Sequence, residues 1–354
     1  MTDLEQPANT GGSPEAPPPS ATLTQMLFGA LVQKSICVAV QLGVPDLLGR
    51  GPQSAEELGE KTHAHAPSLF RVLRMLASAG VFAQTPDHKF GLTPISELLR
   101  SDVPDSMHGL VMTLGEDWAW RNWGELMHSV KTGQTGQQKA HGMGLFELFE
   151  QNPEAAEMFN GVMTSLSRAV APALVGAYDF TGVGRLADIA GGHGMLLAAI
   201  LKANPQMQGV LFDLPSVLEG AGEVLEQEGV RSRVELASGD FFQSVPAGAD
   251  VYMMMNIIHD WDDACCLTIL KNVYTAMQDG GKKDGGKVLI IQSVVPETGE
   301  PHYSKMIDLE MLVSVGGKER TEEEYRRLLE ASGFRMTRVI PTMSPFHMIE
   351  GEPA

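Results

Sequence analysis

Residues 185–201, Arg-Leu-Ala-Asp-Ile-Ala-Gly-Gly-His-Gly-Met-Leu-Leu-Ala-Ala-Ile-Leu, contain three structural signals in succession. A short apolar strand ends at Asp188, a glycine-rich turn follows, and an apolar run of helix formers begins at Met195. This order predicts the first βα unit of a nucleotide-type sheet. Glycines in such a turn let backbone N–H groups approach a ligand, and the start of the helix favours an anionic group.

The spacing of the glycines limits what this turn binds. When Gly192 and Gly194 are aligned on the first two glycines of the dinucleotide pattern G-x-G-x-x-G, Leu197 occupies the place of the third, so the NAD reading fails. A phosphate loop fails as well, because no Lys-Ser or Lys-Thr follows. An acidic strand end beside a glycine turn suits a ligand with an amino group and a carboxylate, and S-adenosylmethionine fits. A tight turn without a ligand remains the alternative.

Acidic residues also end the next two predicted strands. Residues 209–215 end around Asp213, which in a doubly wound sheet would lie beside the first turn and could accept both hydroxyls of a ribose. Residues 234–242 contain Asp240 followed by Phe241, which could accept from an adenine amino group and pack on the base. Each aspartate alone is more often a loop cap. Three acids at successive strand ends favour a nucleoside ligand.

A continuous apolar run, residues 249–258, is typical of a central parallel strand that is buried on both faces. It places His259, Asp260 and Trp261 at the carboxyl edge of the sheet, where open α/β sheets carry their chemistry. Asp262 or Asp263 can cap the helix that follows. A lone histidine is usually structural, but His259 at this position is a candidate general base.

Five blocks together carry a family resemblance: residues 188–194, 212–215, 239–242, 259–261 and 316–321. In order and spacing the chain resembles the S-adenosylmethionine-dependent O-methyltransferases of the plant caffeate and bacterial aromatic-polyketide type, from about residue 22 to the C-terminus. The resemblance implies an α/β fold, with a Rossmann-like class I methyltransferase sheet domain and an N-terminal all-α winged-helix dimerisation domain. It also implies a homodimer with S-adenosylmethionine as cofactor.

The resemblance assigns roles to residues of this chain. Glu319 matches an acid that orients the base, although it could instead be a helix N-terminal charge, and Gln292 stands where plant members carry glutamate. Ala190 replaces the first glycine of the turn, and Met255 replaces a common lysine or arginine. The implied cofactor contacts are Asp188, Ala190, Gly191, Gly192, Gly194, Asp213, Leu214, Gly239, Asp240, Phe241 and Met255.

The reaction implied is in-line displacement of the sulfonium methyl by an oxygen nucleophile, with His259 taking the acceptor proton. A phenol with a pKa near 10 lies about 3.5 units, or roughly 5 kcal/mol, above histidine, which the site can offset. For an aliphatic alcohol the gap grows to roughly 12 kcal/mol. We therefore expect a phenolic or enolic acceptor on a small aromatic compound. Candidate substrate contacts are Trp118, Phe146, Met163, Asp260 and Asp308, the last of which could equally be solvated.

The expected domains are a disordered tail over residues 1–21, a winged-helix dimerisation domain over 22–103, a helical linker over 104–178 that forms part of the acceptor pocket, and a catalytic domain over 179–354. A winged helix often binds DNA, but here glutamates precede the candidate recognition helix and leave it without a net basic face. We expect no nucleic-acid partner.

Composition is consistent with an acidic enzyme. The 354 residues are 43% hydrophobic, enough for two cores, and a net charge of −18 argues against nucleic acid and anionic membranes. Three cysteines are too few and too badly spaced for a disulfide framework or a zinc site, so we expect no metal and a cytoplasmic protein. No run was expected to approach the roughly 20 residues of a membrane span.

Three alternatives remain at this stage. The departures at Gln292 and Met255 leave open a relative that keeps the cofactor pocket but catalyses a non-methylating reaction, such as hydroxylation or cyclisation. Transfer to nitrogen or carbon is a second alternative. A binding-only regulator built on the winged helix is the third.

Overall fold

The computed structural model describes residues 17–104, 106–281 and 285–354. The chain divides into two compact units, one ending at Gly115 and the other beginning at Glu116. Most of the predicted tail, residues 1–16, lies outside the described residues. Helix α1 (Pro19–Leu27) starts two residues before the predicted end of the tail at residue 21, with proline at its first position, where the missing N–H costs nothing.

The N-terminal unit is helical apart from one hairpin. Helices α4 and α5 are followed by the antiparallel pair β1–β2, which is the order of a winged helix. Its core is formed by apolar side chains of both helices and the hairpin, among them Leu58, Leu73 and Phe90. The elements are α1, α2 (Gly29–Gln41), α3 (Val44–Leu48), α4 (Ala55–Thr62), α5 (Ala66–Ser78), β1 (Phe82–Gln84), β2 (Phe90–Leu92), α6 (Pro94–Glu97) and α7 (His108–Gly115).

The stretch Pro19–Gln41 corrects one expectation. It is 23 residues long and apolar enough to cross a membrane by length and composition alone, whereas the sequence was expected to contain no such run. The stretch is interrupted at Phe28, which ends α1 and precedes α2. Its Lys34 Nζ donates to the Gly115 carbonyl 2.7 Å away, within the same unit. The structure thus uses α2 as a packing helix of the N-terminal unit.

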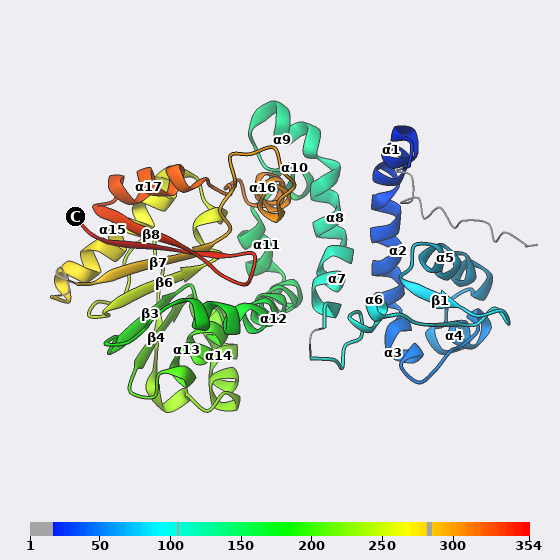
Figure 1. Cartoon of the computed structure of the whole chain (residues 1–354), viewed down its shortest axis with the longest axis horizontal. Helices are drawn as coiled ribbons and strands as arrows, with labels where there is room; N and C mark the ends of the chain where they lie inside the picture. Colours follow the sequence, from blue (N-terminus) through cyan, green and yellow to red (C-terminus); the bar gives the residue numbers. More distant parts are fainter. Residues whose placement is uncertain (1–16, 105, 282–284) are drawn as a thin grey trace, which may run out of the picture. The chain divides into compact units, whose positions relative to one another are not determined.

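The C-terminal unit is built on a seven-stranded sheet in the order β5-β4-β3-β6-β7-β9-β8 (Figure 1). Every neighbouring pair from β5 to β7 is parallel, and β9 runs antiparallel to both β7 and β8. The strands are β3 (Arg185–Ile189), β4 (Gln208–Asp213), β5 (Val234–Ser238), β6 (Val251–Met255), β7 (Lys287–Gln292), β8 (Phe334–Pro341) and β9 (His347–Pro353).

Alternate side chains of the central strands pack on different helices. In β6, Met253 joins a core with α12 (Pro153–Ala177), α13 (Met195–Ala203) and α14 (Pro215–Gln227), and Met254 joins a core with α15 (Asp263–Asp279) and α17 (Glu322–Ala331). Both faces of the sheet are therefore covered, which explains the unbroken apolar run of this strand. The predicted α/β class, with its parallel strands and separate N-terminal helical domain, is confirmed.

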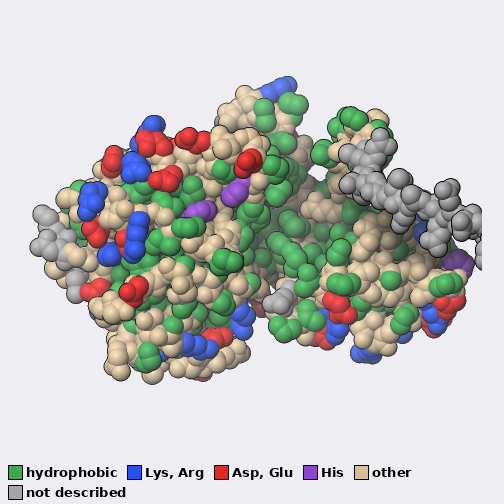
Figure 2. Space-filling view, viewed as in Figure 1, with side chains coloured by type: hydrophobic (Ala, Val, Ile, Leu, Met, Phe, Trp, Pro, Cys, Tyr) green, Lys and Arg blue, Asp and Glu red, His purple; other side chains and the backbone are tan. Residues whose placement is uncertain are grey.

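Shorter helices precede and interrupt the sheet. Phe149 forms a small aromatic core with Trp118 and Phe159. These elements are α8 (Asp117–Gly124), α9 (Leu126–Thr132), α10 (Gly136–His141), α11 (Leu145–Gln151), α16 (Tyr303–Ser314) and the 3-10 turns η1 (Arg231–Arg233) and η2 (Ile258–Asp260). Figure 2 shows acidic and basic side chains side by side over α17, where Arg326 and Arg327 pair with glutamates one turn earlier.

Candidate active site

The glycine turn between β3 and α13 lies directly against Asp188. A Cβ on Gly191 would come 2.5 Å from the Asp188 carboxyl carbon, so this position accepts only glycine. Gly192 and Gly194 have left-handed φ values of 60° and 77°, and Ala190 has φ 54°. Ala190 therefore holds, at a small steric cost, the backbone conformation that a glycine would adopt freely.

Asp213, at the end of β4, holds this turn in place. Its Oδ2 accepts the Gly192 N–H at 2.8 Å and its Oδ1 accepts the Leu214 N–H at 2.7 Å. Burial raises the pKa of Asp213 to about 6. Burial, with the nearby charge of Asp213, raises the pKa of Asp188 to about 8. Within residues 17–104, 106–281 and 285–354, no lysine or arginine forms an ion pair with Asp188 or Asp213, and such a pair beside a glycine cradle fits a positively charged nucleoside ligand such as S-adenosylmethionine.

Asp240, just beyond the end of β5, caps its own turn. Its Oδ1 accepts the Phe242 N–H at 2.8 Å and its Oδ2 accepts from Gln243 Nε2 at 3.3 Å. Gly239 packs on the Phe212 ring, where an added Cβ would come within 2.7 Å of a ring carbon. The loop-cap alternative is thus realised for Asp240. Its role toward adenine, with that of Phe241, stays a prediction, as do those of Leu214 and Met255.

His259 is reached through a left-handed residue. Asn256, with φ 55°, ends the extended run after β6 and turns the chain into η2, which carries His259. The imidazole is buried, and its Nδ1–H donates to Glu319 Oε1 at 2.8 Å. Burial opposes the charged imidazolium, but the carboxylates of Asp260 and Glu319 outweigh burial and raise the pKa of His259. The structure thus places the Glu319 carboxylate on the imidazole, and its role as the orienting acid stays a prediction.

Gln292 takes part in the same network from the end of β7. Its Nε2 lies 2.9 Å from His259 Nδ1, 3.2 Å from Glu319 Oε1 and 3.3 Å from Asn256 Oδ1. The amide thus joins this network without adding charge. On the other side of the ring, Asp260 Oδ1 lies 3.5 Å from His259 Nε2. Burial raises the pKa of Asp260 to about 6.

The segment that carries Glu319 is held against the His259 turn by backbone contacts. A Cβ on Gly317 would lie 2.0 Å from the His259 carbonyl oxygen, so the backbones of these two segments are in contact at this glycine. Asp308 Oδ1, on α16, accepts the Glu319 N–H at 2.9 Å. Asp308 is therefore not simply solvated, and the structure gives it a supporting role behind Glu319. Its predicted contact with substrate stays a prediction.

Three of the predicted acceptor residues, Phe146, Trp118 and Met163, come from three helices of the same unit. Phe146 on α11 stacks on Trp261, with ring centroids 5.6 Å apart, which brings α11 to the His259 turn. Trp118 on α8 packs edge-on against Phe149 at 5.4 Å. Met163 is half-buried on α12 and precedes Thr164, whose hydroxyl lies 3.1 Å from His193 Nδ1. The roles of Trp118, Phe146 and Met163 in binding an acceptor stay predictions.

Sequence reasoning missed three residues that the structure connects to this site. Asn256 carried no signal, because only the fold brings it to Gln292. His193 was noted as part of the glycine turn but not as a contact of α12. Arg320 lies within the block 316–321, but nothing in the sequence indicated that its side chain would be buried.

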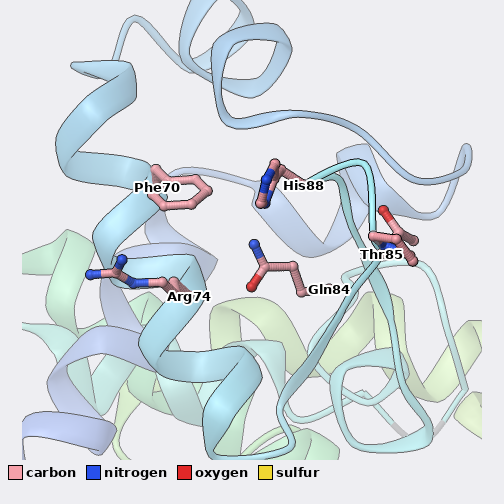
Figure 3. A pocket seen from close by; sticks show the side chains of 6 residues that line it. Phe70, Arg74, Gln84, Thr85 and His88 are labelled. Atoms are coloured by element: carbon pink, nitrogen blue, oxygen red, sulfur yellow. The ribbon is translucent and has the colours of Figure 1, made fainter.

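Outside this network, a depression of about 440 Å³ lies in the N-terminal unit. Figure 3 shows the side chains that line it, Phe70, Arg74, Gln84, Thr85, Pro86 and His88. None of them is a predicted site residue. Among the residues that the structure describes, no group of three or more histidine, cysteine, aspartate or glutamate side chains could hold a metal ion.

Two known domains match the chain. Residues 24–102 match the O-methyltransferase dimerisation domain, and residues 123–335 match the O-methyltransferase domain. The chain is 43% identical over 338 residues to the phenazine O-methyltransferase PhzM of Lysobacter antibioticus, covering 96% of this chain and 97% of that protein.

Solved structures share the whole fold. The structure of LaPhzM matches with a TM-score of 0.90 and 43% identity, covering 96% of this chain and 100% of that one. The O-methyltransferase NcsB1 from neocarzinostatin biosynthesis, solved with S-adenosylmethionine and 2-hydroxy-5-methyl naphthoic acid, matches with a TM-score of 0.78 and 29% identity, covering 91% and 96%. The cofactor in that structure agrees with the one that the glycine cradle and its carboxylates fit here.

Proposed function

The chain belongs to the family of S-adenosylmethionine-dependent O-methyltransferases, and from that premise we propose that it methylates a phenolic or enolic hydroxyl of a small aromatic natural product, with His259 as general base. One observation carries the proposal. The buried imidazole donates through Nδ1 to Glu319, which leaves Nε2 as the nitrogen that can take a proton. Fixing one ring nitrogen in this way also fixes the orientation of the other.

The residues around the glycine turn would hold the cofactor. Bound S-adenosylmethionine supplies a methyl group on a positively charged sulfur. Asp213 would accept the ribose hydroxyls while its Oδ2 keeps the Gly192 N–H in place. Asp188 lies under the turn, and the positive charge of the bound cofactor would favour its ionised form. Asp240 and Phe241 would contact the base.

The raised pKa of His259 favours a weakly acidic acceptor. The pKa gap between free histidine and a phenol is about 3.5 units, and raising the pKa of the base narrows it. An aliphatic alcohol would still lie far above the base. Stacked aromatic side chains next to the base, Phe146 on Trp261, suit a planar acceptor. NcsB1, with its bound naphthoic acid, supports the same class of acceptor for this chain.

The test is methyl transfer from methyl-labelled S-adenosylmethionine to a panel of phenols, enols, aliphatic alcohols and aromatic amines. We expect labelled product from the phenols or enols, and a loss of about 10²- to 10⁴-fold in His259→Gln, as for removal of a general base. Equal rates in both proteins would reject the role of His259. Label appearing only on amines would reject hydroxyl transfer.

We also propose that the chain forms a homodimer through its N-terminal unit. Helices α1 and α2 expose large apolar side chains within the range that matches the dimerisation domain: Met26 (71%), Leu27 (70%), Leu31 (58%) and Phe28 (56%). Contiguous exposed apolar groups of this kind mark association surfaces. Light scattering after gel filtration should give twice the 38.2 kDa of the chain. A monomer at micromolar concentration would contradict the proposal.

A further inference from the structure

Arg320 follows Glu319 directly and is the largest fully buried side chain in the described part of the chain. Its guanidinium does not contact the imidazole. Instead, Nη1 donates to the Ile258 carbonyl at 2.8 Å and Nη2 donates to the Trp261 carbonyl at 3.0 Å. These two carbonyls bracket His259 and Asp260, so one side chain spans both ends of the turn that carries the base.

The bracketed turn packs on Gly317, and hydrogen bonds to its carbonyls hold its two ends. It links the end of β6 to the start of α15, and such a connection satisfies its buried carbonyls without the ladder of a strand or helix. Cys266 Sγ is a second, weaker donor to the Ile258 carbonyl at 3.2 Å. An arginine with donors fixed in a plane is suited to join two carbonyls at a set spacing. A buried carbonyl left without its donor would cost about 1–3 kcal/mol.

The guanidinium is itself held from the helix side. Asp263, the first residue of α15, accepts at Oδ1 from Arg320 Nη2 at 2.7 Å and from Nε at 3.1 Å. The Arg320 backbone is fixed too, because its carbonyl accepts the Val295 N–H at 2.9 Å and it forms a parallel bridge with Val294. Arg320 therefore connects the turn of the base to two rigid elements, the start of α15 and the segment after β7.

Neighbouring residues on this segment act on the same histidine in different ways. Glu319 contacts the ring, and Arg320 contacts the peptide groups on either side of it. The 2.8 Å bond between His259 Nδ1 and Glu319 Oε1 requires the turn and the segment to keep a fixed separation. Among the described contacts, the hydrogen bonds from Arg320 to the Ile258 and Trp261 carbonyls join the His259 turn directly to the segment that carries Glu319.

We propose that Arg320 is a positioning residue for methyl transfer, which fixes the turn from Ile258 to Trp261 so that the imidazole remains on Glu319 and Nε2 keeps its direction. The inference rests on the proposed role of His259 as base. It assigns no contact between Arg320 and substrate or cofactor. Loss of the guanidinium should therefore reduce turnover while cofactor binding is preserved.

The experiment compares Arg320→Met, Arg320→Lys and a matched control, Arg338→Met. Arg338, on β8, donates to the buried carboxylate of Glu350, on β9. Its loss therefore also removes an arginine that holds a buried group, but one that is not part of the His259 turn. In Arg320→Met we expect kcat to fall about 10- to 100-fold, with the dissociation constant of S-adenosylhomocysteine within about twofold of wild type. Arg320→Lys should recover part of the loss. Arg338→Met should lose stability but keep kcat.

Histidine NMR gives a readout that a purely structural role would not change. With the His259 signal assigned by its absence in His259→Gln, its pKa should be lower in Arg320→Met than in wild type, since burial remains and the carboxylate moves away. An unchanged pKa and kcat in a folded Arg320→Met would overturn the inference. If that variant does not fold, Asp263→Asn, at a half-exposed anchor, should lower the pKa in the same direction, and no change there would also overturn it.

The two proposals fail differently. Activity retained in His259→Gln rejects the general base, whatever Arg320 does. A dead His259→Gln with a fully active Arg320→Met rejects only the positioning role.

Discussion

Glu319 supplies the carboxylate that His259 Nδ1 contacts, so its charge should set the pH at which the base becomes active. A general base must be neutral to accept a proton, and a raised pKa therefore places the acid limb of the rate above the usual histidine value of about 6.5. Glu319→Gln keeps an acceptor for Nδ1–H but removes the charge. We predict that the acid limb of kcat moves to lower pH and that the plateau falls roughly tenfold, because the base is weaker.

The control for this change is Glu324→Gln. Glu324 lies on the same segment, and its carboxylate closes a capping box with Thr321 rather than contacting the imidazole. Its loss should cost helix stability, about 1 kcal/mol, and leave the pH profile unchanged. A Glu319→Gln enzyme whose acid limb stays in place would show that the charge does not reach the base.

Asp213 offers a second test at the scale of one residue. Its carboxylate already accepts two backbone N–H groups, and its remaining lone pairs are available for ribose hydroxyls. We predict that Asp213→Ala weakens binding of S-adenosylmethionine by about 1–3 kcal/mol through unpaired hydroxyls. Calorimetry would measure this, with Glu223→Gln on the exposed side of α14 as the control. Equal affinities for the three proteins would reject the ribose contact.

At the scale of elements, His193 links the glycine turn to two helices. Thr164 on α12 donates its hydroxyl hydrogen to the Asn160 carbonyl, so its oxygen accepts from His193 Nδ1 at 3.1 Å. On the other side, the ring lies against α14, where a Cβ on Gly220 would come 2.7 Å from His193 Nε2. The turn is thus wedged between the helix that carries Met163 and the helix that follows Asp213.

This wedge predicts opposite outcomes for two glycines of α14. Gly220→Ala should displace the His193 ring and with it the turn, and weaken cofactor binding about tenfold. Gly222→Ala meets nothing within 4 Å and should stabilise the helix by roughly 0.5–1 kcal/mol while affinity stays the same. Calorimetry and thermal unfolding separate the two. Equal affinity in both variants would mean that the turn does not depend on the wedge.

The carboxyl edge of the sheet could be predicted from the sequence. The acids at 188, 213 and 240 were predicted at one sheet edge because apolar runs of strand length ended beside them, and parallel strands share that edge. The place of His259 followed from the same rule. Each of these inferences uses only local patterns and one topological principle.

The features that the sequence did not predict depend on contacts between segments that are far apart in the chain. Arg320 looks like one more charge in a polar run until the fold buries it against Ile258 and Trp261, 59 to 62 residues earlier. The left-handed turn at Asn256 and the antiparallel pairing of β9 are likewise tertiary outcomes.

At the scale of the whole molecule, buried carboxyl groups make stability depend on pH in two directions. Burial opposes ionisation of Glu350, but hydrogen bonds from Arg338, Thr337, Tyr178 and Lys287 lower its pKa to about 2. That contribution is present above the unfolded value of about 4.3 and is lost as pH falls toward 2. Its loss makes the fold less stable in acid, and it does not distinguish pH 5 from pH 8.

Asp188 acts in the opposite direction. Its pKa is about 8 in the fold and about 3.9 in the unfolded chain, so the stability it contributes is complete below about pH 4 and is lost as pH rises toward 8. Asp213, with a pKa of about 6, adds to the same trend. We therefore predict that the unfolding free energy of the cofactor-free protein falls by a few kcal/mol between pH 5 and pH 8.

Urea denaturation at fixed protein concentration across this pH range would measure the fall, and Asp188→Asn would isolate its cause. The amide cannot ionise, so the variant should lose most of the slope and become the more stable protein at pH 8. S-adenosylmethionine should reduce the slope in the wild type, because its positive charge favours the ionised carboxylates, and its affinity should rise from pH 6 to pH 8. If the wild-type slope matches that of Asp188→Asn and affinity is flat with pH, the buried carboxylates under the glycine turn carry no uncompensated charge, and the electrostatic argument for a cationic ligand fails.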